Sequence, residues 1–382
     1  MKIKALILST GLAMFSMFFG SGNLVFPLMV GQTSEGHFCL ATIGILLTGV
    51  LVPFLGILAM LLFNGNSNDF FSRLGKPATF WFPLIALSLM GPFGVLARCI
   101  TVAHGAFRLL MPESSLWFFS IVACAVIFVL TIRKNKIVPV LGSVLTPFLL
   151  LSLAAIAVFG LLSVDLPAAP PSGGWPSFKQ GIFQGYQTMD LLAAFFFSSF
   201  VIKHLRNHKT IQSDPGKSMP TFLKSALLGA GLLSVIYFIL VLLGTIYAPQ
   251  LAAVPPQEML GFVAQQSLGA WAAPVVCVAV VLACLTTAIV LTSLFADFLR
   301  KEVTRDRISP ATALITTLAI AFFTSTLEFS GIAKILGPIL EVTYPALIVL
   351  TVLSILHKLW GWNTVRMPIA VAFLLKLLFR AV

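Results

Sequence analysis

The chain has 382 residues, of which 59% are hydrophobic and only 9% are charged. A soluble domain carries about 25% charged residues, so this composition excludes an ordinary soluble enzyme and indicates an integral membrane protein. The formal net charge of +12 would suit a nucleic-acid-binding protein. However, the basic residues lie at the ends of hydrophobic segments, where they indicate membrane topology, and we therefore expect no nucleic-acid partner.

Hydrophobic segments long enough to cross a bilayer follow one another along the chain. A membrane-spanning helix needs about 20 residues, because the hydrocarbon core is about 30 Å thick. The hydrophobic pattern predicts such helices near residues 5–30, 39–63, 79–108, 115–132, 138–163, 183–202, 220–247, 272–298, 309–327 and 332–356. A further one near 367–382 is short and carries Lys376 and Arg380. We expect an all-α integral membrane protein of about 11 transmembrane helices, in one domain over residues 1–382.

The ten longer helices divide into two sets of five. Because five is an odd number, the second set enters the membrane from the side opposite to the first, as in an inverted repeat. We expect repeat one over about 1–163, repeat two over about 180–356, and an extra C-terminal span over about 367–382. The oligomeric state stays open.

The basic residues predict the orientation. If the N-terminus is inside, most of the 24 Lys and Arg residues lie at inner helix ends and in inner loops, as the positive-inside rule requires. We therefore expect a multi-pass protein of a bacterial inner (plasma) membrane, in contact with lipid and with a cytoplasmic N-terminus.

The first predicted helix is interrupted by Gly20-Ser21-Gly22-Asn23. Glycine permits unusual backbone dihedrals, and unwinding frees backbone polar groups. The half-helix that starts near Asn23 presents a positive N-terminal end suited to a carboxylate, whereas the carbonyls from Ser16 to Phe19 suit a small cation. The alternative is an ordinary packing seam, in which the glycines allow close helix contact.

A second interruption, Gly185 to Asp190, lies in the first helix of the second set. In hydrocarbon an unwound backbone is tolerated only where protein or a water-filled cavity satisfies its polar groups. A matched pair of such breaks indicates the binding site of a secondary transporter built from inverted repeats. Transport is therefore the leading hypothesis, with Tyr186, Gln187, Thr188 and Asp190 as candidate binding residues.

Three charged residues, Asp190, Glu341 and Arg98, lie inside predicted spans. A charge in mid-bilayer costs at least ~2.5–3.5 kcal/mol on insertion scales, so each of them faces a cavity or a partner by default. Arg98 is either a binding residue or half of an ion pair, with Asp190 or Glu341 as candidate partners. For Glu341 a protonated, hydrogen-bonded state is an equal alternative.

The eighth predicted helix contains Ala283, Thr286 and Thr287, which share one face because their spacing is i, i+3, i+4. Two hydroxyls beside the free carbonyls of the first helix would form an oxygen cage for a hard cation such as Na⁺. The alternative is that each threonine bonds back to a carbonyl of its own helix.

The sequence gives little support for an enzymatic function. The chain contains no HExxH, GxSxG or Walker A motif. Its cysteines show no metal-ligand spacing, and its histidines do not cluster with carboxylates. We expect no cofactor and no catalytic residues. A membrane-embedded enzyme acting on a lipid-linked substrate would need surface carboxylates such as Asp69, Asp165 and Asp214.

At these residues the chain resembles the branched-chain amino acid:cation symporters, also called system II carriers. The resemblance rests on Phe18-Phe19-Gly20-Ser21-Gly22-Asn23-Leu24-Val25-Phe26-Pro27, Gly91-Pro92 with Arg98, Gly185-Tyr186-Gln187-Thr188-Met189-Asp190, Ala283-Cys284-Leu285-Thr286-Thr287-Ala288, and Pro338-Ile339-Leu340 with Tyr344-Pro345. It covers nearly all of the chain, from residue 18 to residue 345.

The resemblance implies a LeuT-type 5+5 inverted-repeat fold with discontinuous helices 1 and 6. It also implies secondary active symport of Leu, Ile and Val into the cell, coupled to Na⁺ or H⁺. By that analogy Gly20, Ser21 and Gly22 hold the substrate carboxylate, Tyr186 to Asp190 hold its other face, and the cation lies between Thr286, Thr287 and the carbonyls near Ser16 and Phe19. The alternative is a cation-coupled carrier of another amino acid or small metabolite on the same fold.

Two departures from the family pattern are visible. The family usually has twelve spans, whereas here the last is missing and the eleventh is thin. Glu341 also stands where a small or apolar residue is expected, which leaves the coupling ion open.

Overall fold

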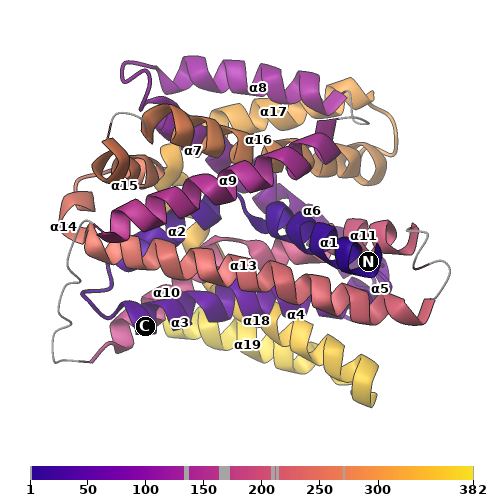
Figure 1. The fold of residues 1–382 in the computed structure, drawn as a ribbon. Helices are drawn as coiled ribbons and strands as arrows, with labels where there is room; N and C mark the ends of the chain where they lie inside the picture. Colours follow the sequence, from indigo (N-terminus) through magenta and orange to yellow (C-terminus); the bar gives the residue numbers. More distant parts are fainter. Residues whose placement is uncertain are drawn as a thin grey trace.

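The computed structural model of the protein describes residues 2–132, 137–162, 173–207, 211, 215–269 and 272–381. Within these ranges the chain consists of helices and connecting loops (Figure 1). The helices of the first half are α1 (Lys2–Phe18), α2 (Ser21–Gln32), α3 (Phe38–Leu46), the π-helix η1 (Leu47–Leu51), α4 (Val52–Leu62), α5 (Ser67–Ser72), α6 (Ala78–Met90), α7 (Val95–Phe107), α8 (Leu116–Ile132) and α9 (Ile137–Leu162).

The helices of the second half include both halves of another broken span and end in a helix that lies along α18. They are α10 (Trp175–Gln187), α11 (Asp190–Asn207), η2 (Pro215–Lys217), α13 (Ser218–Ile246), α14 (Ala248–Leu251), η3 (Pro256–Glu258), α15 (Met259–Leu268), α16 (Ala272–Phe298), η5 (Leu299–Val303), α17 (Pro310–Ser325), α18 (Glu328–Trp360) and α19 (Arg366–Ala381). Each hydrophobic segment predicted from the sequence is helical in the described residues.

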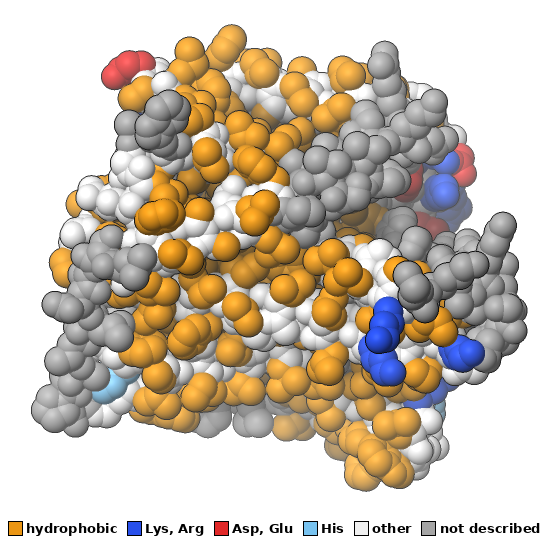
Figure 2. All heavy atoms as spheres, in the orientation of Figure 1, with side chains coloured by type: hydrophobic (Ala, Val, Ile, Leu, Met, Phe, Trp, Pro, Cys, Tyr) orange, Lys and Arg blue, Asp and Glu red, His pale blue; other side chains and the backbone are white. Residues whose placement is uncertain are grey.

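Among the described residues, five helices are long and apolar enough to cross a membrane: Phe38–Leu62, Ala78–Phe107, Ser218–Ile246, Ala272–Val303 and Glu328–Trp360. The pair formed by α1 and α2 makes a sixth, broken span. Three shorter apolar stretches of helix are found in the same residues: Leu116–Ile132, Leu150–Leu161 within α9, and Pro310–Ser325. Hydrophobic side chains cover the middle of the face shown in Figure 2, and the visible Lys and Arg side chains gather at the end where the N-terminus lies.

The first break differs by a few residues from the prediction. The axes of α1 and α2 differ by 71°, and the chain leaves helical geometry at Phe19 and Gly20, whereas Ser21, Gly22 and Asn23 form the first turn of α2. The Asn23 side chain causes this shift, because its Oδ1 accepts a 3.0 Å hydrogen bond from the Gly20 N–H and so caps the new helix.

The second break is confirmed between α10 and α11. It is narrower than the six predicted residues, since only Thr188 and Met189 lie outside the two helices. The first half-helix starts at Trp175, earlier than the predicted residue 183. Pro176 at the first turn is a favourable helix start, and the polar residues that follow it hide the helix from a hydrophobicity pattern.

A third interruption was not predicted. The expected continuous helix over 79–108 is divided into α6 and α7 at Gly91 to Gly94. A Cβ on Gly94 would lie 2.0 Å from the Leu89 carbonyl oxygen, so only glycine fits this turn. The second span also contains the π-helix η1, a local widening that is frequent at functional sites.

Two glycine seams hold the half-helices α2 and α10 in place. A Cβ on Gly31 of α2 would lie 2.0 Å from the Val241 carbonyl oxygen of α13, and one on Gly244 would lie 2.2 Å from the Leu28 carbonyl oxygen. On the other half-helix, a Cβ on Gly181 of α10 would lie 2.3 Å from the Ala41 carbonyl oxygen of α3. Backbones therefore approach directly in both seams, as small residues allow in membrane helices.

Candidate functional site

The two helix breaks meet in the interior and are joined by side-chain hydrogen bonds. Asn23 Nδ2 donates to Asp190 Oδ2 at 2.7 Å and lies 2.6 Å from the Tyr237 hydroxyl, which itself lies 3.3 Å from Asp190 Oδ2. All three side chains are at most 3% exposed. A buried carboxylate is costly unless it is hydrogen-bonded, so this cluster gives Asp190 the partners that the sequence alone did not identify.

The first break provides backbone donors. Ser21 and Gly22 start α2, and the first N–H groups of a helix have no partner within that helix. A Cβ on Gly22 would lie 3.3 Å from Thr188 Cα, so the turn of one break touches the other break. The Ser21 hydroxyl accepts a 3.5 Å hydrogen bond from Cys99 Sγ of α7. The free backbone N–H groups at the start of α2 suit a carboxylate.

The second break contains a strained residue. Met189 has a φ of 60° and is buried, a backbone conformation that non-glycine residues rarely adopt. Thr188 Oγ1 donates a 2.9 Å hydrogen bond to the Gly185 carbonyl and so closes the end of α10. Strain of this kind persists only where the surroundings enforce it, and it clusters at ligand sites.

The structure brings only part of the predicted cation cage together. Thr287 lies beside the first break, since a Cβ on Gly20 would be 3.4 Å from Thr287 Oγ1. Thr286 and Thr287 both donate back to the Ala283 carbonyl, at 2.8 and 3.3 Å, so the alternative weighed from the sequence is realised. Their hydroxyl lone pairs remain able to face a cation. Phe19, in the break, is buried.

Ser16, on α1, is the least connected member of the predicted cage. In the described part of the chain no hydrogen bond joins its side chain to either threonine. Its predicted role would use only the backbone carbonyl, which lies in the last turn of α1. Carbonyls of a last turn have no partner within their own helix.

Arg98 pairs with neither Asp190 nor Glu341. Its Nη1 donates to the Gln187 carbonyl and its Nη2 to Gln187 Oε1, both at 2.8 Å. The guanidinium lies 5.1 Å from the ring centre of Phe26 and 5.5 Å from that of Phe329. It therefore stabilises the C-terminal end of α10, where a cation is favoured by the helix dipole, and the predicted ion pair is wrong.

Glu341 has a different partner from the one considered. Its Oε1 lies 3.6 Å from Lys376 Nζ of α19. Three residues further along α18, the ring of Tyr344 lies 5.0 Å from that of Tyr186. Tyr186, a predicted binding residue, is 8% exposed and is thus buried at the end of α10, next to the second break.

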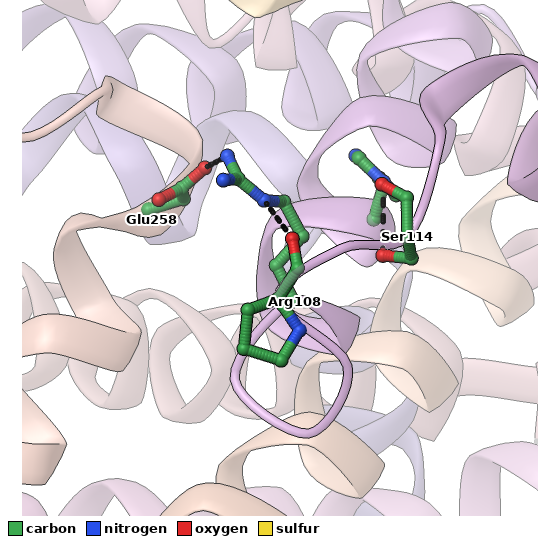
Figure 3. A network of polar contacts seen from close by, with 5 residues as sticks. Arg108, Ser114 and Glu258 are labelled. Carbon is green, nitrogen blue, oxygen red and sulfur yellow. Dashed lines mark hydrogen bonds and ion pairs between the residues drawn. The ribbon is translucent and has the colours of Figure 1, made fainter.

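Other polar groups lie away from the breaks. Figure 3 shows a network at the end of α7, in which Arg108 Nη1 lies 2.5 Å from Glu258 and its Nε donates to the Pro112 carbonyl, next to Ser114. No group of three or more His, Cys, Asp or Glu residues that could hold a metal occurs among the described residues. Of the surface carboxylates considered for an enzyme, Asp165 and Asp214 lie outside those residues.

Sequence reasoning missed Tyr237 and Cys99. Tyr237 lies within an apolar helix where it resembles core packing, and only its proximity to Asp190 gives it a polar role. A single tyrosine in an otherwise apolar span was the one available signal, because a buried tyrosine hydroxyl usually finds a partner.

Comparisons with known proteins identify the family of the chain. A family model described as "Branched-chain amino acid transport protein" matches residues 3–380. The chain is 30% identical over 360 residues to the branched-chain amino acid permease BrnQ of Corynebacterium glutamicum, covering 93% of this chain and 82% of that one. It is 26% identical over 380 residues to BrnQ of Escherichia coli, covering 98% and 85%.

Solved structures show the same fold. MhsT in complex with L-phenylalanine matches with a TM-score of 0.62 and 16% identity, covering 97% of this chain and 98% of that one. Mhp1, a nucleobase-cation-symport-1 family transporter, matches in a closed conformation with bromovinylhydantoin bound, with a TM-score of 0.61 and 14% identity, covering 97% and 91%. The all-helical LeuT-type fold expected from the sequence is thereby confirmed.

Proposed function

Because this chain belongs to the branched-chain amino acid transport protein family and is a multi-pass membrane permease for branched-chain amino acids, we propose that it is a cation-coupled symporter whose substrate binds at the two helix breaks. The substrate carboxylate accepts hydrogen bonds from the free N–H groups of Ser21 and Gly22, and the substrate ammonium group faces Asp190. Leu, Ile and Val differ only by a methylene or by the position of a methyl branch. The polar groups at the breaks therefore bind the ammonium and carboxylate groups that all three amino acids share.

The observation that carries this proposal is the hydrogen bond between Asn23 and Asp190. It connects the two breaks, so the carboxylate-binding turn of α2 and the acidic start of α11 form one site. A zwitterion presents both charges to such a site, with its anion at a helix N-terminus and its cation toward a carboxylate. An apolar ligand without these charges would leave the first N–H groups of α2 without an acceptor.

The coupling ion proposed is Na⁺, with H⁺ as the alternative. The support for Na⁺ is the position of Thr287 beside Gly20, where hydroxyl and carbonyl oxygens are the ligands that a hard cation prefers. The support for H⁺ is the burial of Asp190, a carboxyl that can carry a proton through the membrane. Either cation would offset the charge of the substrate carboxylate.

Alternating access is proposed to move α1, α2, α3, α4, α10, α11 and α13 as a unit against the other helices. The glycine seams support this division, since α2 packs backbone to backbone on α13 and α10 does so on α3. Rocking of one packed unit around a fixed site is the usual motion in such folds.

The proposed location is the inner (plasma) membrane of a bacterium, with the N-terminus in the cytoplasm. Its support is the asymmetry of the basic residues, which Figure 2 displays at the end of the molecule that carries the N-terminus. Cytoplasmic loops carry the excess of Lys and Arg in membrane proteins.

The test is uptake of radiolabelled leucine into proteoliposomes under an inward Na⁺ gradient, and in a second series under a proton gradient alone. Accumulation that requires Na⁺ supports the site at Thr287. Accumulation driven by protons alone moves the coupling role to Asp190. Leucine that only equilibrates, with no accumulation under either gradient, contradicts symport.

A further inference from the structure

Helix α19 brings a positive charge to the side of the candidate site. The side chains of Lys376 and Glu341, which form the 3.6 Å ion pair, are 35% and 37% exposed. Glu341 lies near the middle of the long span Glu328–Trp360. A single charge at this depth is costly and faces a partner by default, so each of these residues accounts for the presence of the other.

The same ammonium group also contacts the broken helix α10. Lys376 Nζ lies 5.1 Å from the ring centre of Phe183, a distance at which the face of an aromatic ring attracts a cation. Lys376 therefore touches two helices, α18 through Glu341 and α10 through Phe183.

These contacts connect Lys376 to Tyr186 by two routes, one through Phe183 and one through α18. Phe183 and Tyr186 are three residues apart on α10, and their rings lie 6.2 Å apart. Glu341 and Tyr344 are three residues apart on α18, and the centre of the Tyr344 ring lies 5.0 Å from that of Tyr186, with the two rings tilted by 36°. Since residues three apart share one face of a helix, Tyr186 is held on one side by Tyr344 and on the other by a pair that Lys376 connects.

We infer that Lys376 is a positioning residue for substrate binding, which fixes Tyr186 and the end of α10 through Phe183 and Glu341. This inference rests on the proposed binding of substrate at the two helix breaks, and it places the substrate beside Tyr186, which precedes the second break on α10. It gives α19 a part in the transport site, and it accounts for Glu341, the acidic residue that departs from the family pattern.

The test compares leucine uptake kinetics, normalised to the amount of reconstituted protein, for Lys376→Met, Lys376→Arg, Glu341→Gln and the double variant Lys376→Met/Glu341→Gln. Loss of the ammonium should raise the KM for leucine about three- to tenfold, as expected when a contact of this kind is removed. Lys376→Arg keeps the charge and should stay within about twofold of the natural protein. Lys358→Met is the matched control, because Lys358 also lies over a phenylalanine ring, that of Phe63, but away from the breaks.

The double variant separates positioning from stability. It leaves no unpaired charge in the membrane, so its yield and thermal midpoint should recover, whereas its KM should stay raised. A KM that returns to the natural value in the double variant would show that the unpaired Glu341 was the cause, and would overturn the inference. The inference is also overturned if Lys376→Met lowers the thermal midpoint and leaves the KM unchanged. If Lys376→Met does not fold, the double variant gives the same KM comparison.

Tyr186→Ala distinguishes this inference from the proposed function. If Tyr186→Ala leaves the KM unchanged, the placement of substrate beside Tyr186 is wrong and the inference falls with it. If Tyr186→Ala raises the KM and Lys376→Met does not, only the role of Lys376 is wrong.

Discussion

Asn23 and Asp190 are 167 residues apart in the chain, yet the amide of one donates a 2.7 Å hydrogen bond to the carboxylate of the other. Each belongs to a turn where a transmembrane helix is interrupted. This single contact makes two separate irregularities of the backbone into one polar site within an apolar interior.

Replacing Asn23 by Ala should abolish most transport. The change removes the acceptor of the Gly20 N–H and the amide that donates to Asp190 and Tyr237, whereas Asp190 and Tyr237 keep the 3.3 Å hydrogen bond between them. A buried group that loses its partner costs about 1–3 kcal/mol. We expect leucine uptake per folded molecule to fall at least about tenfold. Thr316→Ala, which alters an exposed threonine bonded within α17, is the control and should retain full uptake. Equal uptake by the two variants would contradict the site.

Thr287→Ala should weaken the dependence of uptake on Na⁺, because Thr287 Oγ1 would lie 3.4 Å from a Cβ on Gly20, in the first break. Hydrogen bonds to charged groups contribute about 1.5–3 kcal/mol, so the Na⁺ concentration for half-maximal uptake should rise about tenfold or more. The comparison is Thr292→Ala, which removes another buried hydroxyl of the same helix. A Na⁺ titration that shifts equally in both variants argues against the cation site.

Gly185→Ala should prevent correct assembly of the second half-helix. The added methyl would lie 2.0 Å from Thr48 Oγ1 and 2.9 Å from the backbone nitrogen of Gly49, so α10 must move away from the second span. We expect loss of monodisperse protein in size-exclusion chromatography. Gly231→Ala is the matched control, because nothing lies within 4 Å of its added methyl. In a helix interior that change should be neutral or stabilising by up to about 1 kcal/mol. If the two variants give equally monodisperse protein, close packing at Gly185 is not required for assembly.

Arg98→Gln should impair transport far more than Arg108→Gln. Arg98 is 1% exposed and donates to both the carbonyl and the side chain of Gln187, so its loss leaves two partly buried acceptors without this donor, at up to about 1–3 kcal/mol each. The pair between Arg108 and Glu258 is partly solvated and contributes about 0–1 kcal/mol. Uptake and the thermal midpoint of both variants, measured side by side, check this ranking.

Much of the fold could be predicted from the sequence because hydrophobic segments and paired glycine-containing breaks are local signals. The break around Gly20 and the break before Asp190 needed only the order of residues along one helix. The exact turn in the first break depended on a side chain, that of Asn23, bonding back to Gly20, which hydropathy does not report. The start of α10 at Trp175 was missed because its first turns are polar.

The partners of buried groups could not be predicted in the same way. Charge alone suggested that Arg98 would pair with an acidic residue, but Gln187 satisfies it through a carbonyl and an amide oxygen. Tyr237 joins Asp190 from a helix whose sequence is almost uniformly apolar. Such pairings depend on which helix faces come together, and that is fixed by packing across more than a hundred residues.

The glycine seams also determine when the protein can become functional during its synthesis. The half-helix α2 rests on α13, and α10 rests on α3, so each half of the chain supplies the support for the break of the other. A ribosome that has released only the first half leaves the amide of Asn23 in the bilayer without its carboxylate. Asn23 gains both of its side-chain partners only when Asp190 and Tyr237 are also in the membrane, so a fragment that ends before Tyr237 lacks part of this site.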